Sequence, residues 1–180
     1  MKVLITRHGK TDWNLQRKIQ GSVDTDLNEF GIKQAEEVRE KLKDTKIDIV
    51  FSSPQKRAYM TAEIIMQGRD VPIVVDERIR ERGYGILEGA EKNNVQDWKY
   101  VAYRLDQDVD VENIEQFRDV WVRIKSFFDD ITTNYKDKNV LVVFHGGVSI
   151  LARYYFEKDV DVNNLYKFGL DNCEVKEYDF

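Results

Sequence analysis

The chain has 180 residues, of which 42% are hydrophobic and 34% are charged, a composition typical of one globular domain with a substantial core. Its net charge of −5 argues against nucleic-acid binding as the main activity. We see no signal peptide and no apolar run as long as a membrane span, so we expect a cytoplasmic protein that does not bind membranes. One cysteine and two histidines allow no internal disulfide and no zinc framework.

Strand and helix patterns alternate from the start of the chain. Residues 3–5 are a compact apolar run that stops at charged residues, which predicts a buried strand. Asn28 is a suitable N-cap for a helix that continues to about Lys43, because the apolar residues between them repeat on one helical face. Residues 47–51 form a second apolar run and predict a second buried strand.

The middle of the chain begins with a helix signal and ends in an ambiguous segment. Ser53 and Pro54 follow the second strand and suit the N-cap and the first turn of a helix. A short third strand is expected at residues 71–75. Residues 83–111 carry glycines and then acidic residues, and their pattern favours no regular element.

The last third of the chain contains the clearest amphipathic helix, whose apolar residues recur at spacings of three and four and are best explained by core packing. These residues are Ile114, Phe117, Trp121, Ile124, Phe128 and Ile131. A strand at 140–144 leads through Gly146 into another helix, and a weak alternating strand follows at 175–178. This order predicts a single α/β domain over residues 1–180, with a mostly parallel central sheet between two layers of helices.

Polar clusters follow the first four predicted strands. They are Arg7-His8-Gly9, the segment 52–57, the segment 77–83 and His145-Gly146-Gly147. Sites in such folds gather beyond the carboxyl ends of the strands. The clusters supply arginines, two imidazoles, a carboxylic acid and a backbone N–H at a helix start, which together suit a phosphoryl group. The only two histidines of the chain are therefore candidates for one shared site.

The same clusters resemble the motifs of the histidine phosphatase superfamily, the phosphoglycerate mutase-like proteins, in the right order along nearly the whole chain. Arg7-His8-Gly9 with Trp13-Asn14 is similar to the opening motif. The other matching segments are Gln20-Gly21 with Asp26-Leu27, Gly31 with Gln34-Ala35, Ser52-Ser53-Pro54 with Arg57-Ala58 and Thr61-Ala62, Glu81-Arg82-Gly83-Tyr84-Gly85 through Glu88-Gly89, and His145-Gly146-Gly147-Val148. The resemblance implies a phosphoglycerate mutase-like α/β/α sandwich with a lid-like insertion at about 83–113.

The resemblance also implies a role for each site residue. The catalytic set would be His8, Glu81, Arg7, Arg57 and His145, and the phosphate-binding set would be Asn14, Gln20, Gly21 and Gly146. His8 would form a phosphohistidine, while Glu81 would protonate the departing oxygen and later take a proton from water. These roles are physically coherent, because phosphoryl transfer depends on positioning and charge neutralisation, and nearby guanidinium groups keep an imidazole neutral.

Ordinary structural roles compete with these assignments. Arg57 could be a solvated helix residue, Asn14 could only cap its loop, and Glu77 is a rival acid to Glu81. The remaining cations near the motifs are most simply surface charges, although some could line the substrate mouth: Lys10, Arg17, Lys18, Arg80 and Arg82. Lys10 stands where glutamate is common in the family and adds positive charge beside the nucleophile.

The family contains phosphatases and mutases, and residues 90–113 favour a phosphatase. Cofactor-dependent mutases usually carry paired arginines there, whereas this chain has Arg104 alone with six acidic residues that would repel a bisphosphoglycerate. The six are Glu91, Asp97, Asp106, Asp108, Asp110 and Glu112.

We therefore expect a phosphoric monoester hydrolase of the histidine acid phosphatase type. It would act on a small phosphate ester without a metal or another cofactor. The alternatives are a phosphoglycerate mutase and a phosphoprotein-binding member with little turnover. The sequence does not indicate an oligomeric state.

Overall fold

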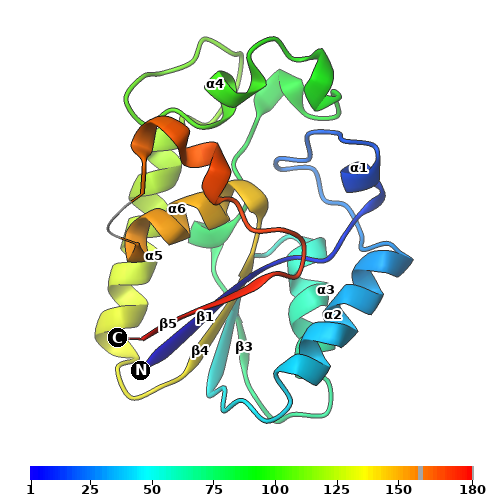
Figure 1. Ribbon diagram of the computed structural model, residues 1–180, viewed down its shortest axis with the longest axis vertical. Coiled ribbons are helices and arrows are strands. Elements are labelled where there is room, and N and C mark those ends of the chain that lie inside the picture. Colours follow the sequence, from blue (N-terminus) through cyan, green and yellow to red (C-terminus); the bar gives the residue numbers. More distant parts are fainter. Residues whose placement is uncertain (158–159, 180) are drawn as a thin grey trace.

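The computed structural model (Figure 1) describes residues 1–157 and 160–179, so residues 158–159 and 180 of the expected domain lie outside the described part. Five strands form one sheet in the order β3-β2-β4-β1-β5. They are β1 (Lys2–Arg7), β2 (Ile49–Ser52), β3 (Ile73–Val75), β4 (Val140–Phe144) and β5 (Val175–Asp179). The first four run parallel, and β5 pairs antiparallel with β1. The predicted mostly parallel sheet is confirmed.

Helices cover both faces of this sheet (Figure 1). The four longest helices are α2 (Glu29–Lys41), α3 (Lys56–Met66), α5 (Phe117–Asn134) and α6 (Gly146–Phe156). Successive side chains of a strand point to opposite faces, and β4 shows the result. Leu141 and Val143 pack in one buried cluster with α2 and α3, whereas Val140, Val142 and Phe144 pack in another with α5 and α6. The predicted three-layer α/β/α sandwich is confirmed.

The starts of two helices differ in how well the sequence predicts them. Asn28 caps α2 as expected, because its side-chain oxygen accepts the N–H of Gly31 at 2.9 Å. The predicted start of α3 is wrong: its N-cap is Gln55, and neither Ser53 nor Pro54 belongs to the helix. The hydroxyl of Ser53 is hydrogen-bonded instead to His145, 92 residues away in sequence.

The predicted boundary of α5 is also wrong by one turn. Ile114 precedes the helix and forms an isolated β-bridge with Tyr84, so α5 begins only at Phe117. The buried stripe of Phe117, Ile124, Phe128 and their neighbours faces the sheet as expected. Burying a Phe or Ile side chain contributes about 1.5–3 kcal/mol, so this stripe is a main contributor to the α5–α6 side of the core.

The strand register brings the predicted clusters to one edge of the sheet. Arg7 of β1 pairs with Phe144 of β4, and Ser52 of β2 pairs with Val143 of β4. His8, Ser53 and His145 therefore leave three adjacent strands at nearly the same level. This convergence follows from the parallel direction of the strands.

Residues 83–113 lie beyond this edge of the sheet (Figure 1). The short elements in this segment are η2 (Gly85–Leu87), η3 (Lys92–Asn94) and α4 (Trp98–Ala102); elsewhere lie α1 (Asp12–Leu15), η1 (Glu77–Ile79) and η4 (Val162–Phe168). Main-chain hydrogen bonds join the segment to the first loop, including Gly89 N–H to Ile19 O at 2.8 Å and Lys92 N–H to Arg17 O at 3.0 Å. None of the helices formed by the described residues combines the length and apolarity that a membrane span requires.

Candidate active site

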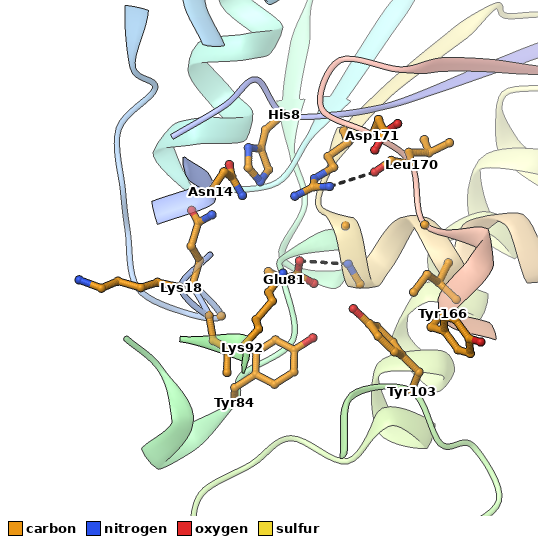
Figure 2. Close-up of a pocket in the computed structure, with 18 of the residues that line it drawn as sticks. His8, Asn14, Lys18, Glu81, Tyr84, Lys92, Tyr103, Tyr166, Leu170 and Asp171 are labelled. Atoms are coloured by element: carbon orange, nitrogen blue, oxygen red, sulfur yellow. Dashed lines mark hydrogen bonds between the residues drawn. The ribbon is translucent and has the colours of Figure 1, made fainter. Parts of the chain in front are cut away.

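A cavity of about 210 Å³ opens at the carboxyl ends of the strands (Figure 2). Its lining includes eight of the nine predicted site residues: Arg7, His8, Asn14, Gln20, Gly21, Arg57, Glu81 and Gly146. The ninth, His145, is fully buried behind the lining, with its ring centre 5.2 Å from that of His8. The structure thus brings all the predicted residues into one place.

His8 is held in the tautomer that suits a nucleophile. Its Nδ1 lies 2.7 Å from the carbonyl oxygen of Gly9, and a carbonyl can only accept, so Nδ1 carries the proton. Burial, followed by the charges of Arg7 and Arg57, lowers the pKa of His8 well below its usual value. The ring is therefore neutral near pH 7, and its lone pair is on Nε2.

His145 is held by a residue that follows the neighbouring strand β2. Its Nε2 lies 2.7 Å from the hydroxyl of Ser53, which already accepts the N–H of Gln55 at 3.3 Å. This arrangement favours donation from Ser53 to Nε2 and leaves the ring proton on Nδ1, a buried atom without a hydrogen-bond partner. Burial and then the charge of Arg57 lower the pKa of His145 well below its usual value.

Two guanidinium groups lie beside the histidines, that of Arg57 on a fully buried residue and that of Arg7 on a half-buried one. Arg7 donates from Nη1 to the carbonyl of Leu170 at 3.0 Å, and Arg57 donates to the carbonyls of Val23 at 2.7 Å and Gly21 at 2.9 Å. The Nε of each arginine is buried without a partner. Burial lowers the pKa of Arg57 to about 10, so the group remains charged at neutral pH. The interpretation of Arg57 as a solvated helix residue is wrong, since none of its surface is exposed.

Glu81 lies across the cavity from His8 (Figure 2), with both carboxylate oxygens on backbone donors. One oxygen accepts the N–H of Arg82 at 3.0 Å, and the other accepts the N–H of Gly147 in the first turn of α6 at 3.1 Å. A negative group is favoured at this helix end. A Cβ atom on Gly147 would lie 2.8 Å from the carboxylate, so a glycine permits the close approach. The rival acid Glu77 is exposed in η1 and does not line the cavity.

Asn14, Gln20 and Gly21 of the first loop line the cavity, and each also forms hydrogen bonds with other parts of the protein. The Oδ1 of Asn14 accepts the N–H of Thr11 at 3.0 Å in the cap of α1, so Asn14 has the capping role that competed with phosphate binding and also lines the cavity. The Oε1 of Gln20 accepts from the hydroxyls of Thr11 and Thr25. The carbonyl of Gly21 accepts from Arg57 and from Gln55.

Three residues for which the sequence predicted no role in the site connect its parts. The side chain of Gln55 donates to Gly21 O and accepts the N–H of Glu81. Thr61 accepts the N–H of Gly9 and donates to Arg57 O; its position four residues after Arg57 on α3 was the available signal. Arg82 was expected at the surface, but it is buried and donates to the carbonyls of Glu115, Val101 and Ala102. It therefore links the Glu81 loop to α4.

The segment 83–113 contributes one cation and three aromatic residues to the lining of the cavity, and these are Lys92, Tyr84, Trp98 and Tyr103. The six acidic residues of the segment do not line the cavity, so the predicted repulsion of a bisphosphate would have to act from outside it. Arg104 does not line it either and pairs with Asp106 at 2.6 Å. Of the two glycines after Glu81, only Gly85 has a positive φ, of 56°, which lets the chain turn sharply.

Within residues 1–157 and 160–179, no three His, Cys, Asp or Glu side chains are grouped so that they could hold a metal ion. The cationic groups around His8 are instead those of the protein itself, Arg7 and Arg57. The arrangement presents a neutral imidazole, two guanidinium groups, a second imidazole and a carboxyl group to one small space. Such a set can bind a tetrahedral anion and transfer its central atom to nitrogen.

A sequence model described as the histidine phosphatase superfamily (branch 1) matches residues 3–180. The match covers almost the whole chain, so the protein belongs to the histidine phosphatase superfamily, as its motifs indicate.

Individual members of this superfamily are similar to the chain over most of its length. Phosphoserine phosphatase 1 of Hydrogenobacter thermophilus is 30% identical over 177 residues, which cover 96% of this chain and 83% of that protein. The metal-independent phosphoserine phosphatase of Arabidopsis thaliana is 36% identical over 160 residues, covering 82% of this chain and 65% of that one. The solved structure of Bacillus stearothermophilus YhfR superposes with a TM-score of 0.88 at 28% identity, covering 98% of this chain and 89% of the other. Other relatives are named as probable phosphoglycerate mutases.

Proposed function

We propose that this protein is a metal-independent phosphomonoesterase that hydrolyses a small phosphorylated metabolite through a phosphohistidine on His8. Three buried nitrogens carry this proposal: Nε of Arg7, Nε of Arg57 and Nδ1 of His145, all on residues around His8 and all without a hydrogen-bond partner in the described part of the chain. A buried donor left unpaired costs about 1–3 kcal/mol. A phosphoryl group, with three acceptor oxygens, would remove that cost.

In the first step of the proposed reaction, Nε2 of His8 attacks phosphorus and the bond from phosphorus to the ester oxygen breaks. Glu81 gives its proton to the departing oxygen, which leaves as an alcohol. Arg7 and Arg57 balance the charge on the equatorial oxygens, and the Nδ1–H of the neutral His145 donates a hydrogen bond to one of them; pre-organised donors have their largest effect there. Asn14, Gln20, Gly21 and the N–H of Gly146 complete the binding of the phosphoryl group.

In the second step, water attacks phosphorus and the bond from phosphorus to nitrogen breaks. Glu81 takes the proton from that water, so its first protonation state is restored. Inorganic phosphate leaves and His8 is again neutral. The residues from 83 to 113 act as a lid in this proposal, because Lys92, Trp98 and Tyr103 of that segment close one side of the cavity.

Hydrolysis is favoured over return of the phosphoryl group to the substrate because of the cationic side chains that the lid lacks. The paired arginines that mutases of the family usually carry there are missing, and the single Arg104 pairs with Asp106 away from the cavity. The phosphoserine phosphatases among the relatives support the same choice, and the name of the Arabidopsis relative supports metal independence. Phosphoserine and other small phosphate esters are therefore the first substrates to try.

Two parallel assays test this function. One follows phosphate release from a panel of phosphorylated metabolites, and the other follows conversion between 3-phosphoglycerate and 2-phosphoglycerate with a coupled enzyme system. We expect phosphate release without isomerisation. Isomerisation that exceeds phosphate release would replace the proposal by a mutase, and the absence of both activities would favour a phosphoprotein-binding member.

A further inference from the structure

A second hollow, which we call the entrance groove, adjoins the catalytic cavity and has a volume of about 450 Å³. Five cations line it, Arg7 of the predicted catalytic set together with Lys10, Arg17, Lys18 and Lys92, and no aspartate or glutamate does. Lys18, Lys92 and Trp98 also line the catalytic cavity, so the two hollows are continuous. A positive groove on a chain with a net charge of −5 indicates a local function for the charge.

The four cations of the groove other than Arg7 are not neutralised by a neighbouring carboxylate. In the part of the chain that the structure describes, none of them forms an ion pair with a carboxylate. The ammonium of Lys18 lies 5.7 Å from the ring centre of Trp13, and that of Lys92 lies 5.8 Å from the ring centre of Trp98. Two acidic residues line the adjoining catalytic cavity, Glu81 and Asp171.

Lys92 stands where the groove meets the cavity. Burial, followed by the charge of Arg7, lowers the pKa of its ammonium, and the charge of Glu81 opposes this shift. A partly desolvated cation beside another cation is stabilised by an anion between or near them. In Figure 2 the Lys18 side chain extends away from Glu81, toward the outer side of the pocket.

The walls of the groove are fixed by the backbone. Arg17 has a φ of 55°, in the left-handed region that non-glycine residues rarely adopt. Its carbonyl accepts the N–H of Lys92 at 3.0 Å, and its N–H donates to Asn14 O at 3.2 Å. Strained backbone held by its surroundings is often found at ligand sites. The cations of the first loop and of the lid are therefore mounted on one connected framework.

We infer that the physiological phosphoester carries a second anionic group, a carboxylate or a second phosphate, and that the entrance groove binds this group while the reacting phosphoryl group occupies the cavity. This inference rests on the proposed phosphatase function. It also gives Lys10, which stands where the family commonly has glutamate, a role in substrate choice.

Two pairs of substrates test the inference. The first compares 3-phosphoglycerate with glycerol 3-phosphate, and the second compares propane-1,3-diol bisphosphate with 3-hydroxypropyl phosphate. Within each pair one anionic group is replaced by a neutral one, so the pair that shows the larger preference identifies the anion. The protein is compared with a Lys10→Met/Lys18→Met double variant and with Lys41→Met, a control at the exposed end of α2.

We expect the unaltered protein to prefer the member with the second anion by about tenfold or more in kcat/KM in at least one pair. The double variant should lose most of this preference through KM, and Lys41→Met should keep it. The preference of the unaltered protein should also shrink as salt rises from about 0.05 to about 0.5 M, which tests the inference without a variant.

Equal kcat/KM within both pairs would overturn the inference, as would a preference that neither salt nor the double variant reduces. Hydrolysis of p-nitrophenyl phosphate in those cases would leave the proposed function standing. Failure to hydrolyse any ester, p-nitrophenyl phosphate included, would overturn the proposed function and the inference with it.

Discussion

The Glu81→Gln substitution should remove the proton donor while keeping the shape of the side chain. Both oxygens of Glu81 accept backbone N–H groups, from Arg82 and Gly147. Glutamine keeps one acceptor oxygen, so one of the two N–H groups would face an amide that can only donate. The change therefore affects chemistry and local stability separately, and the two effects can be measured apart.

The size of each effect follows from the structure. Loss of a general acid typically costs about 10²–10⁴-fold in rate, which corresponds to about 2.7–5.5 kcal/mol in the barrier. Loss of one buried hydrogen-bond partner should cost about 1–3 kcal/mol of stability. The first effect depends on the leaving group, because a good leaving group needs little protonation; the second does not.

Steady-state kinetics on an alkyl phosphate and on p-nitrophenyl phosphate separate these effects. We expect Glu81→Gln to be severely impaired on the alkyl ester and much less so on p-nitrophenyl phosphate, while urea unfolding reports the stability change. Glu77→Gln is the matched control, because Glu77 is exposed and outside the cavity, and it should behave like the unaltered protein on both substrates.

Two results would refute this reasoning. A larger defect in Glu77→Gln than in Glu81→Gln would transfer the acid role to Glu77. Equal losses on both substrates would mean that Glu81 orders the site, through its bonds to Arg82 and Gly147, without donating a proton.

Two further predictions concern protonation and metal ions. The imidazole NMR signals of His8 and His145 should keep their neutral positions as pH falls from about 8 through about 6.5, because the pKa of each lies well below the usual value. The unfolded chain binds these protons and the folded one does not, so the free energy of unfolding should fall as pH drops below ~6.5. The slope should approach roughly 1.4 kcal/mol per pH unit for each histidine about one pH unit lower. A signal that titrates near 6.5 would contradict both expectations. Exhaustive EDTA treatment should leave phosphate release unchanged, and a loss that added magnesium, zinc or manganese restores would contradict the proposed chemistry.

Much of the fold could be predicted because its signals are local. The apolar run at 140–144 gave the bounds of β4, and Asn28 marked the start of α2. The position of the site could also be predicted from the sequence, because parallel strands bring together the residues that follow their carboxyl ends. His8 and His145 are separated by 137 positions but leave adjacent strands.

The remaining features depend on contacts between distant residues. Ser53 is a good N-cap by composition, yet its hydroxyl contacts His145, and α3 begins two residues after Pro54. Arg82 looks like a surface charge, but its acceptors come from residues 101, 102 and 115, which only the folded chain brings around it. The arrangement of charge in residues 90–113 depends on the fold in the same way: composition shows the excess of carboxylates, but not which side chains face the cavity.

Detection of the covalent intermediate tests the central claim most directly. The protein is mixed briefly with substrate, quenched in alkali and analysed by peptide mass spectrometry, with His8→Ala in parallel. We predict an acid-labile phosphate on His8, formed and lost at rates compatible with turnover, and neither label nor turnover in His8→Ala. A phosphate on serine or threonine, or normal turnover in His8→Ala, would contradict the phosphohistidine mechanism.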